Sequence, residues 1–243
     1  MNAPIEAGLA PYVLTNVRDR VCTITMNRGD RFNALSTSMI AALDEALEAI
    51  GRDQNVRVIV LTGAGRAFCA GHDLTEMRAH IDEAWQRALF DGCTAMMTRM
   101  TQLPQPVIAR VHGPAAAAGC QLVSMCDLAV AADHAKFGLS GINAGIFCTT
   151  PAVGVARNVP RKRAMELLLT GELDAAVDAL AQSIARKSGA AVAMGKRAFY
   201  AQVEQSMASA YETAGHTMAC NMLDPDAAEG IDAFLGKRPP KFR

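Results

Sequence analysis

One stretch restricts the possible folds more than any other: it runs from Pro106 to Asp127 and reads PVIARVHGPAAAAGCQLVSMCD. Its apolar run, Val107 to Val111, predicts a buried strand that ends at His112-Gly113-Pro114. Only small side chains follow before Gln121, and apolar residues then recur at helical spacing. Because the first N–H groups of a helix lack intrahelical partners, this junction predicts backbone donors that a ligand can approach closely. On its own, the pattern also fits tight packing between a helix and a strand.

A second stretch, from Thr62 to Leu74, repeats this arrangement after the β-branched run at 56–61 and reads TGAGRAFCAGHDL. Its three glycines do not have the G-x-G-x-x-G spacing of a dinucleotide site, which argues against a nucleotide-binding fold. The two stretches present backbone N–H groups near His72 and near Ala118. A pair of convergent N–H donors is what an enolate or thioester oxyanion requires.

The rest of the chain alternates predicted strands and helices up to about residue 150 and is helical afterwards, which indicates an α/β fold. The expected elements are a hairpin over 12–26, a helix after Ser36, one long helix over Thr75 to Gln102, helices at 149–158 and 161–170, and further helices from Val177 onward with possible breaks at Gly189, Gly215 and Pro225. Asp73 is expected to cap the helix that follows it.

Charge and cysteine usage exclude several classes of protein. The 24 basic and 24 acidic residues balance, which gives no electrostatic case for a nucleic-acid partner or an anionic membrane. The seven cysteines are odd in number and form no C-x-x-C pair, so we expect neither a metal site nor a disulfide framework. The N-terminus does not read as a signal peptide, and no apolar run is long enough to span a bilayer. We therefore expect a cytoplasmic setting.

Several stretches, in order along most of the chain, resemble the crotonase, or enoyl-CoA hydratase/isomerase, family: NRGDRFNALS, VIVLTGAGRAFCAGHDL, PQPVIARVHGPAAAAGCQLVSMCDLAVAADHAKFG, RKRAMELLLTGE and EGIDAFLGKRPPKF. The motifs GHDL and AAGCQL resemble those of the subgroup typified by the mitochondrial "domain-containing protein 3" members. The resemblance implies a spiral core of β-β-α turns with a C-terminal helical oligomerisation region, assembly into trimers or hexamers, and a role in fatty-acid or acyl-CoA metabolism. It also implies an acyl-CoA ligand and no separate cofactor.

The resemblance further assigns roles to individual positions. The oxyanion-hole N–H donors of the family map onto His72 and Ala118. The positions implied for CoA and its thioester are Arg31, Phe32 and Ala34 in the first loop, Ala70 and Leu74 beside the thioester, and Phe234 and Lys237, a pair that reaches the CoA of a neighbouring chain.

The chain departs from the family at both catalytic glutamates. The first glutamate position holds Gln121, and the second holds Gly141 in FGLSG. Hydration needs groups that activate water and deliver a proton, and neither residue can titrate. His72 is the nearest titratable candidate, although its ring could instead cap a helix or face solvent. Asn143 and Cys148 are expected to face the acyl pocket, with Cys148 as packing rather than nucleophile.

Three functions remain open from the sequence. The chain could be an acyl-CoA enzyme that relies mainly on its oxyanion hole, such as a decarboxylase or thioesterase. It could be a non-catalytic acyl-CoA-binding protein, or an oligomeric scaffold without a ligand. The CoA-loop and oxyanion stretches argue against the scaffold.

We expect a crotonase-like core over residues 1–175 and a C-terminal helical region over 176–243. The family usually carries a further helix and a glycine-leucine-valine segment after TGE-x-x-x-A-A, whereas Ala176 here runs directly into Val177. The sequence thus predicts either a deletion at this joint or a segment missing from the printed chain, and we favour the second.

Overall fold

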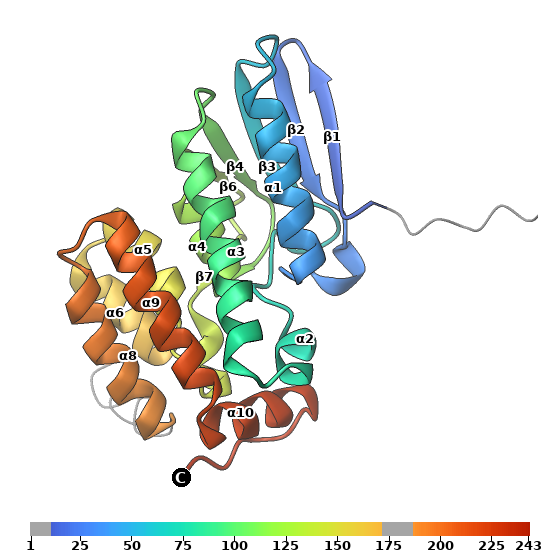
Figure 1. The fold of residues 1–243 in the computed structure, drawn as a ribbon. Helices are drawn as coiled ribbons and strands as arrows, with labels where there is room; N and C mark the ends of the chain where they lie inside the picture. Colours follow the sequence, from blue (N-terminus) through green and yellow to red (C-terminus); the bar gives the residue numbers. More distant parts are fainter. Residues whose placement is uncertain (1–10, 172–186) are drawn as a thin grey trace, which may run out of the picture.

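The computed structural model describes residues 11–171 and 187–243. Its main sheet has five strands in the order β1-β2-β3-β4-β6 (Figure 1): β1 (Val13–Arg18), β2 (Val21–Met26), β3 (Val58–Gly63), β4 (Val107–Val111) and β6 (Leu128–Ala131). The expected hairpin is confirmed, since β1 and β2 are antiparallel, and both turn residues, Asp19 and Arg20, have positive φ. Two residues at positive φ are what a tight I′-type hairpin turn requires.

The remaining strand pairs are parallel, so the chain crosses back between strands through helices. α1 (Thr37–Gly51) and α3 (Glu83–Gln102) lie side by side against the sheet (Figure 1). α1 begins where predicted, because the Ser36 hydroxyl accepts a hydrogen bond from the N–H of Met39 (3.2 Å). Its expected apolar face is buried: Met39, Ile40, Leu43, Leu47 and Ile50. These side chains form the main core together with the inward residues of β2, β3 and β4.

A second, shorter strip of pairing runs beside the main sheet. Leu35 pairs with His72, Cys69 pairs with Ala115, and β5 (Ala115–Ala116) pairs with β7 (Phe137–Gly138), in each case in parallel. Each turn of the chain thus adds one strand to the large sheet and one short segment to this strip. This arrangement is the expected spiral core of an α/β fold.

The helix predicted over Thr75 to Gln102 is wrong in one respect, because the structure has two helices there, α2 (Leu74–Ala79) and α3. Asp82 interrupts the run by capping α3, since its carboxylate accepts the N–H of Trp85 (2.8 Å). The buried Gln86 amide then donates to the carbonyls of Met77 and His80 at the end of α2. Asp73 caps α2 as expected, accepting from the N–H groups of the helix's first turn at 2.9 and 3.2 Å.

The C-terminal part is helical, with α5 (Thr149–Asn158) and α6 (Arg161–Thr170) ending as predicted. α8 (Gly189–Gln202), α9 (Met207–Met222) and α10 (Pro225–Leu235) follow, and Gly215 lies inside α9 rather than breaking it. The predicted domain boundary at 175/176 and the joint at Ala176-Val177 lie outside the described residues. None of the helices in the described part of the chain combines the length and apolar character of a membrane span.

Candidate functional site

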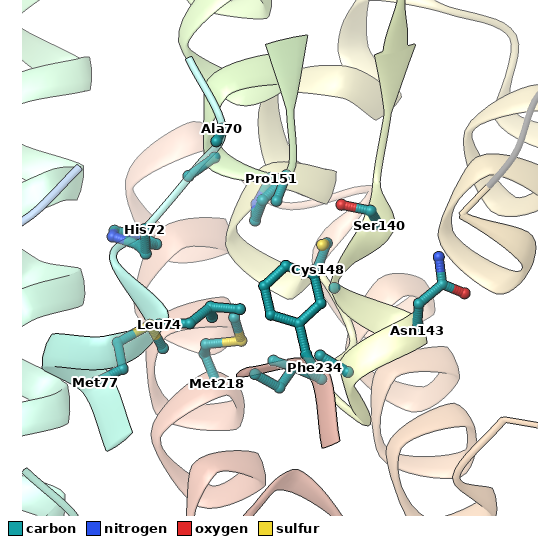
Figure 2. A pocket seen from close by; sticks show the side chains of 15 residues that line it. Ala70, His72, Leu74, Met77, Ser140, Asn143, Cys148, Pro151, Met218 and Phe234 are labelled. Atoms are coloured by element: carbon teal, nitrogen blue, oxygen red, sulfur yellow. The ribbon is translucent and has the colours of Figure 1, made fainter. Parts of the chain in front are cut away.

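An apolar cavity of about 180 Å³ opens beside the short strip of pairing (Figure 2). Its wall is made by the loop after β3, the start of α2, the N-terminus of α4 (Ala118–Ser124), the 3-10 helix η2 (Ser140–Ala144), the start of α5, and single residues of α9 and α10. The lining residues are Ala70, His72, Leu74, Met77, Ala117, Ala118, Ser140, Gly141, Asn143, Ala144, Ile146, Cys148, Pro151, Met218 and Phe234.

The loop that carries His72 holds that residue's backbone in a fixed position. The N–H of Leu35 donates to the Gly71 carbonyl (2.8 Å), and the N–H of Asp73 donates to the Leu35 carbonyl (3.4 Å). The intervening N–H, that of His72, has no hydrogen-bond acceptor within the described residues. The strip of pairing therefore leaves one backbone donor free at the cavity wall.

The second free donor belongs to Ala118, the first residue of α4. The preceding residue, Ala117, has φ 49° and ψ −118°, a conformation that non-glycine residues rarely adopt and that clusters at functional sites. The N–H of Ala117 donates to the Gly138 carbonyl (2.8 Å). The N–H of Ala118 has no acceptor in residues 11–171 and 187–243. A Cβ added to Gly71 would lie only 3.1 Å from the Ala118 nitrogen, so the two loops touch at this point. The two free donors thus lie on neighbouring segments of one wall.

The His72 ring is directed into the core rather than available for proton transfer. Its Nδ1 lies 3.3 Å from the Leu35 carbonyl, and the ring meets Phe90 edge-on with centroids 5.4 Å apart. Burial lowers the pKa of His72 to about 4, against smaller opposite effects of the Leu35 carbonyl and Glu76. The ring is therefore neutral at pH 7. The two alternatives given for the His72 ring from the sequence, capping a helix or facing solvent, are also wrong.

The position of the first family glutamate, Gln121, does not line the cavity. Its side chain is buried, and its amide Nε2 donates to the hydroxyl of Tyr211 on α9 (3.1 Å). That hydroxyl in turn donates to the sulfur of Met125 (3.2 Å). Gln121 thus joins α4 to α9 behind the cavity wall.

The second position, Gly141, does line the cavity, and the space beside it is closed. A Cβ built there would lie 2.7 Å from the Cys148 sulfur and 2.8 Å from the Ile146 carbonyl oxygen. The backbone carbonyl is part of η2's connection to α5 and cannot move away easily. The cavity has no aspartate or glutamate among its described lining residues.

Two expected pocket residues, Cys148 and Asn143, are in the wall. Burial raises the pKa of the Cys148 thiol to about 12, more than a hydrogen bond from Gly141 lowers it, so the sulfur stays protonated at neutral pH. The exposed Asn143 accepts a hydrogen bond from the ammonium of Lys187. Neither side chain can serve as an acid or base near pH 7.

The residues expected to hold CoA in the first loop lie outside the cavity wall, next to it. Arg31 ends the 3-10 helix η1 (Gly29–Arg31), and Ala34 donates its N–H back to the Arg31 carbonyl (3.1 Å). Phe32 is exposed with φ 53°, and the guanidinium of Arg66 lies 4.5 Å from its ring centroid. The N–H of Ala70 donates to the Phe32 carbonyl (3.0 Å), which joins this loop to the cavity.

A residue not singled out from the sequence, Asn33, ties these loops together. It is fully buried, its side-chain oxygen accepts the N–H of Arg28 (3.0 Å), and its Nδ2 reaches the carbonyls of Ala64 (2.9 Å), Ala67 (2.9 Å) and Phe68 (3.2 Å). Its φ of 54° is one that asparagine tolerates better than most residues. An asparagine within a polar turn was the only sequence signal for this role.

Phe234 and Lys237, the C-terminal pair expected to contact CoA, lie in different surroundings. Phe234 of α10 lines the cavity of its own chain (Figure 2), although 63% of its surface is exposed. Lys237 lies beyond the end of α10, exposed and with φ 51°. The contact of this pair with a neighbour's CoA stays a prediction. No cluster of three potential metal ligands occurs in the described ranges.

Comparisons with known proteins show the family of this chain. A family model described as Enoyl-CoA hydratase/isomerase matches residues 16–181. The enoyl-CoA hydratase domain-containing protein 3, mitochondrial, of Xenopus laevis is 39% identical over 261 residues, covering 99% of this chain and 89% of the relative. The human protein of that name is 37% identical, covering 91% and 80%. The resemblance to this subgroup is confirmed.

Solved structures match over nearly the whole chain. An enoyl-CoA hydratase of Mycobacterium smegmatis is 50% identical with a TM-score of 0.67, covering 96% of this chain and 99% of its own. A carnitinyl-CoA dehydratase of Mycobacterium thermoresistibile has a TM-score of 0.88 at 20% identity, which is evidence for the fold alone, and covers 96% of this chain and 92% of its own.

Two further points follow from the relatives. The alignment with the Xenopus laevis protein spans more positions than the 243 residues of this chain, so that relative contains residues that this chain lacks. The vertebrate relatives are named as mitochondrial proteins, which contradicts the cytoplasmic setting expected from the sequence.

Proposed function

Because the chain belongs to the enoyl-CoA hydratase/isomerase family, we propose that it binds a short acyl-CoA and holds the thioester oxygen with the N–H groups of His72 and Ala118. The observation that carries this proposal is the pair of free backbone donors on touching segments of an apolar cavity. Preorganised donors of this kind stabilise an oxyanion in a site from which water is excluded, and removing one typically costs 10²- to 10³-fold in rate.

The size and apolar lining of the cavity support a short acyl group. Leu74, Met77 and Met218 form one apolar side, and Ile146 and Pro151 contribute further apolar surface. A volume of about 180 Å³ leaves room for a few methylene groups and no long chain. The proposed role is therefore in fatty-acid or acyl-CoA metabolism, on substrates with a short acyl chain.

CoA would lie outside the cavity along the first loop. Ala70 and Leu74 flank the thioester in this proposal, while Arg31, Phe32 and Ala34 contact the nucleotide part. The Ala70–Phe32 hydrogen bond supports it, because it places the two groups of residues next to each other. Lys237 would reach a phosphate on the CoA of a neighbouring chain, as the resemblance implies, whereas Phe234 lines the cavity of its own chain.

Hydration by two carboxylates is not part of the proposed chemistry. Each positioned acid or base typically contributes 10²- to 10⁴-fold, and no lining residue titrates near neutral pH. The side-chain amide of Gln121 is hydrogen-bonded to the Tyr211 hydroxyl, and Gly141 has no side chain. We therefore expect hydration of an enoyl-CoA to be very slow.

The same absence of titratable groups favours decarboxylation of a 2-carboxyacyl-CoA as a second candidate. The bond between the α-carbon and the carboxylate breaks, its electron pair forms the enolate, and CO₂ leaves. The charge collects on the thioester oxygen, where the two N–H donors would hold it, and water later supplies the α-proton. This sequence needs no protein acid or base for the bond-breaking step.

Calorimetric titration with butyryl-CoA, crotonyl-CoA and free CoA tests the binding proposal. We expect both thioesters to bind more tightly than free CoA, since only they fill the cavity. Equal affinity for all three would contradict the acyl site. Incubation with a panel of acyl-CoA substrates, followed by mass spectrometry, then separates a decarboxylase or thioesterase from a non-catalytic binding protein. Hydration of crotonyl-CoA with a kcat of about 10 s⁻¹ or more would contradict the expectation of very slow hydration.

We further propose that the chain assembles into a trimer or hexamer, as the resemblance implies. The helical C-terminal region, rich in alanine and methionine, supports this proposal. Light scattering at micromolar concentration tests it, and a stable monomer would contradict it.

A further inference from the structure

We infer that the ion pair between Arg78 and Asp232 is a positioning device that keeps Phe234 over the mouth of the cavity and thereby controls access of the acyl chain. The inference rests on the proposed acyl-CoA site. Neither charged residue lines the cavity. They act through the placement of α10.

α10 is fixed on one side against η2, which forms part of the cavity wall. A Cβ added to Gly230 would lie 2.1 Å from the Ala144 carbonyl oxygen, so the two backbones are in direct contact there. Asp226, at the start of α10, accepts a hydrogen bond from the Ser188 hydroxyl (2.8 Å). These contacts anchor the first two turns of α10. Ile231 and Ala233 are buried further along, so what remains to be held is the exposed side of the last turn, where Asp232 and Phe234 lie.

Arg78 holds that last turn from the opposite wall. It belongs to α2, whose residues Leu74 and Met77 line the cavity. Its Nε and Nη2 donate to the two carboxylate oxygens of Asp232 at 2.8 and 3.1 Å. This fork-to-fork geometry is the strongest arrangement for such a pair, and Asp232 lies two residues before Phe234.

Other charges near α10 do not replace this link. Arg238 also lies close to Asp232, but both of its terminal nitrogens are bound to Glu229 (2.7 and 2.8 Å). The Arg243 pairs with Asp224 and Asp226 likewise stay within the C-terminal segment. Across the described residues, the Arg78–Asp232 pair is the one ion pair that joins α10 to another part of the fold.

The position of Phe234 explains why the link matters. Figure 2 shows its ring amid the other lining side chains, in front of Cys148 in this view, and 63% of the residue remains exposed, so it covers an opening rather than filling the core. The side chains of Arg78 and Asp232 are themselves 35% and 45% exposed. A pair that water can reach opens readily, and its opening frees the exposed side of the last turn of α10, which carries Phe234.

Alkylation of Cys148 measures this opening without any ligand. Cys148 lies in the cavity wall with 1% exposure, whereas Cys220 on α9 is partly exposed and serves as an internal reference. In Asp232→Asn we expect N-ethylmaleimide to label Cys148 about three to five times faster than in the wild type, with Cys220 unchanged. The control is Asp91→Asn, which breaks the Arg87–Asp91 pair on α3, neither residue of which lines the cavity, and should leave both rates unchanged.

A charge swap separates positioning from general destabilisation. Arg78→Asp with Asp232→Arg should return the Cys148 labelling rate close to that of the wild type. A rate in Asp232→Asn equal to the wild-type rate, or a charge swap that labels as fast as the single variant, would overturn the inference.

Titration with butyryl-CoA and free CoA then tests the consequence for binding. In Asp232→Asn we expect a dissociation constant for butyryl-CoA about three to five times higher, with free CoA unaffected. An unchanged butyryl-CoA affinity would contradict control of the acyl site by the pair. If the wild type binds no thioester, the proposed function fails, whereas the labelling rates still decide whether the pair holds α10.

Discussion

Replacing Asn33 with alanine should be among the most damaging single changes in the described part of the chain. The buried amide has two N–H hydrogens for the carbonyls of Ala64, Ala67 and Phe68, so one hydrogen is shared between two acceptors. Its oxygen satisfies the N–H of Arg28. Alanine would leave buried partners on both sides without hydrogen bonds and would have to keep φ near 54°.

The magnitude follows from those losses. A buried polar group left unpaired costs about 1–3 kcal/mol, and at least the Ala67 carbonyl and one further group are affected. The left-handed backbone adds about 1 kcal/mol for a residue other than glycine or asparagine. We expect a total loss of about 3–5 kcal/mol, which lowers the urea midpoint by about 1–2 M at the slope usual for a domain of this size.

Urea unfolding followed by circular dichroism measures the loss, and Asn16→Ala is the matched control. Asn16 lies exposed on β1, and its side chain makes no hydrogen bond within the described part of the chain, so its removal should change the midpoint little. The Asn33 variant should also bind acyl-CoA more weakly, because Asn33 joins the expected CoA loop to the loop of His72. An Asn33→Ala midpoint as close to the wild type as that of Asn16→Ala would refute the reasoning.

Three other outcomes are expected. Gln121→Glu with Gly141→Glu should lower the thermal midpoint without creating hydratase activity, since a side chain at Gly141 meets the Ile146 carbonyl at 2.8 Å; appreciable crotonyl-CoA hydration by this variant would contradict the steric argument. His72, whose pKa is lowered to about 4, binds its proton more readily in the unfolded chain between pH 4 and 6.5, so stability should rise with pH across this window by up to roughly 3 kcal/mol. His72→Gln should flatten that part of the curve in urea titrations, and an identical slope in both proteins would show that the ring is not buried in solution. Lys237→Ala should weaken CoA binding at low salt by at most about fivefold, because the side chain is exposed; an unchanged dissociation constant would show that Lys237 does not contact CoA.

Local signals sufficed for much of the fold. β4, α5 and α6 end where the apolar runs and turn residues predicted, because their boundaries depend on neighbours in the sequence. The break between α2 and α3 was missed, since Asp82 resembles an ordinary polar residue on a helix surface. Its effect depends on Gln86, which closes the end of α2 only after both helices have formed.

Parts of the site depended on contacts that sequence spacing does not encode. The backbone positions of His72 and Ala118 were predicted through small residues and strand ends, and both lie in the cavity wall. The direction of the His72 ring could not be predicted in this way, because Leu35 and Phe90 approach the ring only in the folded chain. Asn33 was missed for the same reason, since its acceptors lie more than thirty residues further along the chain.

The pairing of Cys69 with Ala115 has a consequence for how this site can change over time. His72 and Ala118 each lie three residues beyond one member of that pair, and the two segments stay in contact there, since a Cβ added to Gly71 would lie 3.1 Å from the Ala118 nitrogen. The contact is made by the backbone, so it does not depend on the side chains around the cavity. Substitution of the side chains at both glutamate positions therefore leaves the two backbone N–H groups in place.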